Sequence, residues 1–379
     1  MVRGIAKHGY HCLLAFSYMI DALNVGTTYS TMVNKVDYRF MYYFLSLGPY
    51  IRGFTHMRKV IVVDGTYLYG KYEGVLLSMV AQDTENHIYP IAFCIVDKEN
   101  DASWMFFFKK LKSIVVDGPD LCFISDRHKS IANGSRRHTT MLITAFFLEH
   151  ELGFEKWSRA YLPGNKFDVM TTNIAESVNT ILINEREYPV ESIFNSIAKR
   201  FGEIFRERRA YVLKCKDKKK ISTAEKILRD NLSKDDSFYV ENISGGERKF
   251  DLVKIPYDHV MAALRSMHGD DYSLSVYDYS SPLYKVEEYL LAYSESINVV
   301  SLEYEWCMPQ ELLDVNIIPP LVSYICHYGN PAIFRTSHTD WNPSQKFFDY
   351  AVGKDNGRCS FFKWLDEDSP TSSLSTLNF

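Results

Sequence analysis

Residues 60–96 read VIVVDGTYLYGKYEGVLLSMVAQDTENHIYPIAFCIV, and this stretch decides the fold. Three runs of β-branched and apolar residues, at 60–63, 74–82 and 88–96, predict three strands. The first run ends at Asp64, and only a short polar segment separates the second run from the third. We therefore expect the second and third strands to form a hairpin beside the first.

A helix and a fourth strand are predicted after these three strands. Residues 101–103 (DAS) are of types that begin helices, and aromatic and apolar residues follow at helical spacing up to Leu111. Residues 121–124 form another short apolar run, which closes shortly before Asp126. Three strands, a crossover helix and a further strand predict a mixed α/β sheet.

The composition is that of a globular protein. Of the 379 residues, 46% are hydrophobic and 15% aromatic, which excludes a wholly disordered chain. The formal net charge of -4 excludes a polycation, so any nucleic-acid surface must be local. Seven scattered cysteines favour reduced thiols in a cytosolic or nuclear compartment. The apolar run at residues 12–20 is far shorter than the ~20 residues of a membrane span, so we expect a helix there and no membrane partner.

Two further helices are predicted in the second half of the chain, from residue 172 and over residues 193–205, because apolar residues recur at helical spacing. Residues 199–220 contain ten Lys or Arg and three acids, whereas residues 270–314 contain ten acids and one Lys. A basic helix is usually a solvated face, and the functional alternative is contact with the phosphate backbone of DNA. The candidate DNA-binding residues are Lys199, Arg200, Arg206, Arg208 and Arg209.

Three acidic residues are candidates for a metal-dependent site. Asp64 and Asp126 each follow an apolar strand, and on neighbouring parallel strands their carboxylates would repel each other unless a cation is bound. Mg²⁺ suits such a site when the substrate carries phosphate. Glu176, on the helix from residue 172, would complete a two-metal site for phosphoryl transfer. Taken singly, the three residues also fit a turn residue, a helix start and a solvated helix residue.

The motifs VDGT, IYPIAF, NDASW and ISDRHKSI occur in this order between residues 60 and 131. This stretch resembles the transposase domain of Mutator-like elements (MULEs), which are plant DNA transposons whose relatives include the far-red-impaired-response transcription regulators. A looser similarity continues downstream through residues 153–179 and 185–209.

The resemblance implies an RNase H-like fold with an Asp-Asp-Glu site. The matching residues are Asp64 in VDGT, Asp126 in SDR and Glu176 in TTNIAES. It also implies two bound Mg²⁺ or Mn²⁺ ions, cleavage and strand transfer of double-stranded DNA at transposon ends, and a nuclear location.

This chain also departs from the family pattern. Family members carry a further core strand, a Cys/His motif and a helical insertion between the second and third carboxylates, whereas Glu176 follows Asp126 closely here, and residues 135–138 show no likeness to that region. We therefore expect an incomplete sheet that lacks a strand, with weak or absent catalysis.

Two zinc-finger remnants are similar to known modules but lack ligands. Of the SWIM-finger ligand positions only His259 is retained, and of the four cysteines of a GRF finger only Cys326 and Cys359 remain. Because a structural zinc ion needs four ligands, we expect no Zn²⁺ at either remnant.

The expected organisation is an RNase H-like α/β core followed by a mainly helical region and a small degenerate zinc-finger-like module. The expected boundaries are 1–55 (helical N-terminal remnant), 56–210 (transposase core), 211–320 (helical, acidic, with the SWIM remnant), 321–368 (GRF-type remnant) and 369–379 (disordered tail). Three functions remain open: a catalytically impaired transposase derivative, a domesticated DNA-binding transcription regulator, and a competent transposase.

Overall fold

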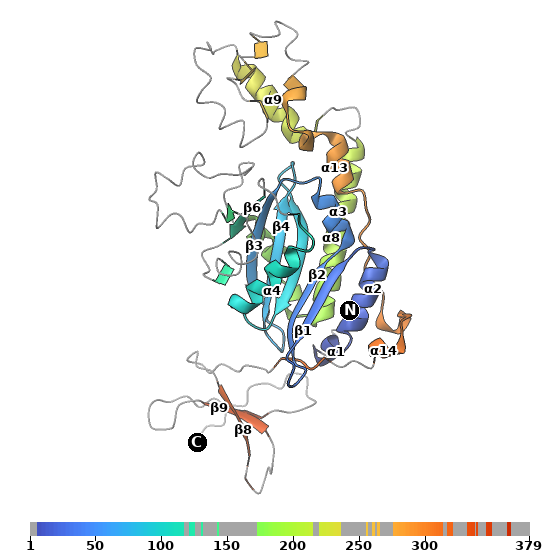
Figure 1. Cartoon of the computed structure of the whole chain (residues 1–379), viewed down its shortest axis with the longest axis vertical. Helices are drawn as coiled ribbons and strands as arrows, with labels where there is room; N and C mark the ends of the chain where they lie inside the picture. Colours follow the sequence, from blue (N-terminus) through green and yellow to red (C-terminus); the bar gives the residue numbers. More distant parts are fainter. Residues whose placement is uncertain are drawn as a thin grey trace. The chain divides into compact units, whose positions relative to one another are not determined.

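The structure, a computed structural model, forms two compact units, Met1–Pro320 and Leu321–Phe379. The residues that it describes are 6–116, 121–125, 130–131, 142–143, 173–214, 220–235, 255–256, 260–261, 264–265, 276–313, 317–320, 332–337, 339, 346–350 and 362–364. Figure 1 shows the larger unit as a twisted sheet with helices packed on it.

A seven-stranded mixed sheet forms the centre of the larger unit, in the order β1-β2-β5-β4-β3-β6-β7. Neighbouring strands are antiparallel from β1 to β3, whereas β6 is parallel to β3 and β7 is parallel to β6. The strands are β1 (Thr28–Val33), β2 (Phe40–Ser46), β3 (Val60–Tyr67), β4 (Val75–Gln82), β5 (Ile88–Val96), β6 (Cys122–Ser125) and β7 (Leu142–Ile143).

The mixed α/β sheet expected from the sequence is confirmed, with three differences. β3 continues to Tyr67, so Asp64 lies inside the strand and not at its end. The N-terminal region, expected to be helical, also contributes β1 and β2 to the sheet. The expectation of a lost strand after β6 is wrong, because the apolar pair Leu142–Ile143 pairs with β6 as the short strand β7.

Two helices cover opposite faces of the sheet. On one face, α4 (Asp101–Leu111) places Phe106 and Phe107 against Tyr42 and Phe44 of β2, at ring-centroid distances of 5.2 and 5.8 Å. On the other, Phe194 of α8 (Val190–Lys214) lies 4.8 Å from the ring of Tyr43. Alternate residues of a strand point to opposite faces, so β2 buries aromatic rings on both. This double cover explains why the central strands are almost continuously apolar.

The predicted starts of the helices are confirmed locally. Asn100 precedes α4 and accepts hydrogen bonds from the backbone N–H groups of Ala102 and Ser103, while the Ser103 hydroxyl accepts one from the Asn100 N–H. This capping box satisfies N–H groups that have no partner inside the helix. The apolar run from Cys12 forms α2, with Cys12 at the N-cap position.

The larger unit contains further helices besides α4 and α8 (Figure 1). The α-helices are α1 (Ala6–His11), α2 (Leu13–Leu23), α3 (Gly48–Phe54), α7 (Asn173–Ile181), α9 (Ser222–Asp235), α13 (Val286–Ala292) and α14 (Gln310–Leu313). The 3₁₀ turns are η2 (Glu185–Glu187), η4 (Val276–Tyr279), η5 (Pro282–Tyr284) and η6 (Glu303–Glu305). No helix among the described residues is long and apolar enough to cross a membrane.

The segment after α13 is held to the N-terminal helices and to α8 by asparagine side chains. The Asn24 amide donates to the carbonyl of Asn298 at 2.9 Å and accepts from its N–H at 2.9 Å. Asn195 of α8 makes the same reciprocal pair with the backbone of Val300, with both distances 2.9 Å. Arg52 of α3 forms an ion pair with Glu295. These contacts fix residues 295–303 against helices that are far away in sequence.

The smaller unit contains a three-stranded antiparallel sheet in the order β10-β9-β8. Its strands are β8 (Ala332–Thr336), β9 (Lys346–Tyr350) and β10 (Phe362–Trp364). Cys326 and Cys359, the retained positions of the GRF-type remnant, lie outside the described residues.

Candidate functional site

Asp64 occupies the face of the sheet that α8 covers. It lies opposite Ser78 on β4, and Ser78 lies opposite Phe93 on β5. Directly paired residues share a face of the sheet, and the Phe93 ring is 5.8 Å from that of Phe201 on α8. The carboxylate of Asp64 is therefore placed between the sheet and the helical layer, where it is half-buried.

α7 packs against β3 and β4 and positions the Asp64 carboxylate. The Nδ2 amide of Asn179 donates to Asp64 Oδ2 at 2.8 Å, and the N–H of Gly65 donates to Oδ1 at 2.8 Å. Val178, next to Asn179, is fully buried, which anchors the helix so that the amide faces the strand. Each carboxylate oxygen thus receives one donor that fixes its orientation.

The two partner carboxylates are only partly described. Glu176 lies in α7 one turn before Asn179, and residues three apart share a helix face; its side chain lies outside the described residues. Asp126 also lies outside them. Ser125, which precedes Asp126 in sequence, pairs with Val63, which precedes Asp64. Among the described side chains, Asn179 contacts Asp64, and the positions of the Asp126 and Glu176 carboxylates remain predictions.

Sequence reasoning missed Arg186, which follows α7 in η2. Its side chain is buried, and its Nη2 donates to the carbonyl oxygen of Asn179 at 2.6 Å. The backbone N–H of Tyr69 donates to the carbonyl of Arg186 at 3.0 Å, and the guanidinium lies 5.9 Å from the Tyr69 ring centroid. A positive charge near the C-terminal end of a helix is favourable. Nothing in the polar sequence around Arg186 signals this contact.

The five candidate DNA-binding residues fall into two groups on α8. Lys199, Arg200 and Arg206 are exposed, while Arg208 and Arg209 are half-buried. Arg200 lies 3.6 Å from the carboxylate of Glu185. Arg209 donates to the backbone carbonyls of Tyr293 and Ser294, which gives it a structural role.

Of the three proposed carboxylate ligands, the structure describes the side chain of Asp64, and a carboxylate is a ligand type that suits a hard cation. Asp64 offers carboxylate oxygens, and the hydroxyl of Ser78 lies at 3.4 Å from the Asp64 carbonyl oxygen. Oxygen ligands of this kind suit Mg²⁺ and not a soft metal. His259, the single retained SWIM position, lies outside the described residues.

Comparison with known proteins gives a family match for part of the central sheet. No curated protein matches the chain, and no solved structure matches it. Residues 60–142 match the family model described as MULE transposase domain. The match begins at the first residue of β3 and ends at the first residue of β7, and covers about a fifth of the chain. This stretch therefore supports a MULE-type, transposase-derived origin of the protein.

Proposed function

We propose that this transposase-derived protein carries a metal-dependent DNA-cleaving site formed by Asp64, Asp126 and Glu176. The position of Asp64 is the observation that supports this proposal. Asp64 directly follows Val63, which pairs with Ser125, the residue before Asp126. Its carboxylate also accepts a hydrogen bond from Asn179 of α7, the helix that contains Glu176. The proposal places the Asp126 carboxylate beside that of Asp64, and its support is the pairing of the residues before them, Ser125 and Val63.

The proposal includes an RNase H-like core. Strands β5, β4 and β3 are antiparallel neighbours, and β6 and β7 follow as parallel neighbours of β3. This is the arrangement expected of such a core. The short strand β7 beside β6 supports this proposal, because a missing strand there was one of the reasons for expecting weak or absent catalysis.

In the proposed site, Asp64, Asp126 and Glu176 would hold Mg²⁺ or Mn²⁺. When bound, these ions supply Lewis-acid activation of the attacking hydroxyl and stabilisation of the leaving oxygen of the DNA phosphate. The contribution of this chain is orientation: Asn179 and Gly65 fix the Asp64 carboxylate from two sides. Precise placement matters because a displacement of about 1 Å can cost on the order of 100-fold in rate.

A plasmid-nicking assay tests the proposal. The full chain is incubated with supercoiled plasmid in Mg²⁺, Mn²⁺ or EDTA, and nicked circles are measured over time. We expect nicking only with a divalent cation, and a loss of at least about 100-fold in Asp64→Asn and Glu176→Gln. Asp21→Asn, a half-buried acid on α2, is the matched control. Equal nicking by Asp64→Asn and the unmodified protein would refute the proposed site.

A second function is favoured by one observation. Lys199 and Arg206 lie seven residues, or about two turns, apart on α8 and are both exposed on one side of the helix, with the half-buried Glu203 between them. Two exposed cations on one helix side fit a DNA-binding regulator that does not cleave. DNA binding in EDTA that weakens as salt rises and on Lys199→Ala, without nicking in Mn²⁺, would favour this second function.

A further inference from the structure

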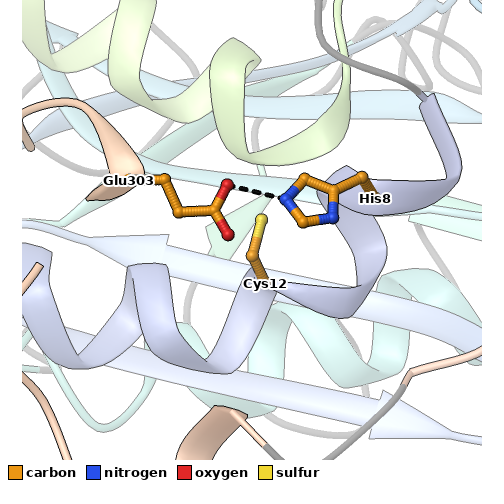
Figure 2. A group of neighbouring side chains, drawn as sticks. All are labelled: His8, Cys12 and Glu303. Carbon is orange, nitrogen blue, oxygen red and sulfur yellow. Dashed lines mark hydrogen bonds and ion pairs between the residues drawn. The ribbon is translucent and has the colours of Figure 1, made fainter.

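Two side chains from the N-terminal helices and one from the segment that follows α13 lie close together. They are His8 of α1, Cys12 at the N-cap of α2 and Glu303 of η6 (Figure 2). Their ligand atoms, a ring nitrogen, Sγ and a carboxylate oxygen, all lie within 4.8 Å of one another. The Nε2 of His8 is 2.6 Å from Oε2 of Glu303.

Backbone hydrogen bonds hold these three residues close to one another. The N–H of Cys12 donates to the carbonyl of His8 at 3.0 Å, as in a continuous helix. His8 and Cys12, four residues apart, therefore lie on the same side of one helical turn. Glu303 is brought to them by the segment that Asn24 and Asn195 hold through Asn298 and Val300.

Negative groups are concentrated around the Cys12 sulfur. The Cys12 side chain is buried, and the Glu303 carboxylate lies beside its sulfur (Figure 2). Glu191 lies so close to α1 that a β-carbon on Gly9 would be 1.9 Å from its Oε2. That oxygen is buried and has no hydrogen-bond partner among the described residues. A divalent cation would compensate the charge of two carboxylates and a thiolate at this place.

We propose that His8, Cys12 and Glu303 bind a divalent transition metal of the zinc class. One nitrogen, one sulfur and one carboxylate oxygen form a donor set that Zn²⁺ accepts and Mg²⁺ does not. The side chains of His8 and Glu303 are 50% and 45% exposed, so solvent can supply a fourth, water ligand. On binding, Cys12 releases its thiol proton to solvent and coordinates as the thiolate.

The geometry needs little adjustment. Zinc–ligand distances of about 2.0–2.3 Å place neighbouring ligand atoms of a tetrahedral site roughly 3.3–3.8 Å apart. The His8–Glu303 contact of 2.6 Å would open by about 0.7–1.2 Å to admit the ion, which rotation of two half-exposed side chains can provide. The site would link α1 and α2 to η6, and none of its three ligands belongs to the zinc-finger remnants.

Cobalt titration of the full chain tests this site. After removal of metals with a chelator, Co²⁺ is added, and the near-ultraviolet thiolate-to-cobalt absorption band and the bound stoichiometry are measured. We expect one equivalent with a thiolate band that Zn²⁺ displaces, and a rise in melting temperature with Zn²⁺. Cys12→Ser should abolish the band, and His8→Ala and Glu303→Gln should weaken binding at least about tenfold.

Matched controls lie in the same elements or nearby. Cys307→Ser replaces an exposed cysteine, His11→Ala a second histidine of α1, and Glu305→Gln a second acid of η6. These variants should bind within about twofold of the unmodified protein. Because Glu303 is half exposed, Glu303→Gln is expected to fold, and its metal-free melting temperature checks this. Absence of a thiolate band, or a band that survives in Cys12→Ser, would overturn the proposal and leave an ordinary His8–Glu303 hydrogen bond.

Discussion

Asp83 joins the β4–β5 hairpin to α13 through a buried hydrogen-bond network. Its side chain is fully buried. Oδ1 accepts from the backbone N–H groups of Glu85 and His87 at 2.9 and 2.8 Å. Oδ2 accepts from the hydroxyls of Tyr289 and Tyr293 at 2.6 and 2.8 Å. Asp83→Ala would leave four donors without an acceptor in the core.

The expected loss follows from these four bonds. A hydrogen bond to a charged group contributes about 1.5–3 kcal/mol, so Tyr293→Phe should lower the free energy of unfolding by about that amount. Asp83→Ala should cost about 3–5 kcal/mol, the usual result of removing one side of a buried charged network. In the Asp83→Ala background, Tyr293→Phe should cost much less, because the two residues act on the same interaction.

The effect also depends on pH. Burial raises the pKa of Asp83, but hydrogen bonds from His87 and Tyr289 outweigh burial and hold its pKa below the usual value. Because the pKa is lower in the folded than in the unfolded state, the stabilisation is complete above the unfolded pKa of about 3.9 and is lost as the pH falls through the folded pKa. The cost of Asp83→Ala should therefore shrink in acid.

Urea unfolding of the full chain at pH 7 and in acid measures both effects, with Asp21→Asn as the control for an acid outside the network. A change in midpoint at constant m-value reports stability. A cost below about 1 kcal/mol for Asp83→Ala at pH 7, or a cost that grows as the pH falls, would refute this account of the network.

Three further outcomes are expected from contacts elsewhere in the larger unit. Asn195→Ala, which removes the reciprocal pair with Val300, should lower stability by about 1–3 kcal/mol in thermal unfolding, whereas Ser196→Ala should change it little. Arg209→Ala should cost about 1–3 kcal/mol because two backbone carbonyls lose their donor, while exposed Arg206→Ala should stay within about 0.5 kcal/mol. Asn179→Asp, which puts a second carboxylate against Asp64, should lower the melting temperature at pH 7. Added Mg²⁺ should restore part of this loss. An unchanged melting temperature would contradict the contact between residues 179 and 64.

Local patterns were sufficient to predict the central strands and main helices. The structure agrees with three local preferences of the sequence. These are the strand preference of the β-branched runs, the helix start at the residues DAS, and the helical spacing of apolar residues in α8. The extension of β3 past Asp64 was missed because the β-branched run ends at Asp64, yet pairing with β4 continues through Gly65 and Thr66. β1 was missed because its residues are mostly half-exposed and carry no clear alternation.

Long-range contacts were beyond prediction from one sequence. The acidic candidates Asp64, Asp126 and Glu176 were proposed from their positions after apolar strands and on a helix, and motif resemblance supported them, whereas Asn179 was assigned no role until its amide was seen on Asp64. The partners of Asp83 lie 206 and 210 residues away, and no local pattern encodes them. The same holds for Glu303, which meets His8 across 295 positions.

The neighbours of β5 decide how this protein can be handled as a fragment. Residues 60–142 would include β5 but exclude β2, which pairs with it, and would exclude Phe201 and Phe205 of α8, which cover Phe93 and Tyr89. An excised piece with these limits would present a bare strand edge and an uncovered aromatic surface, both of which promote aggregation. Expression trials should therefore cut the gene outside the helices that flank the sheet, and not at the ends of the recognisable transposase stretch.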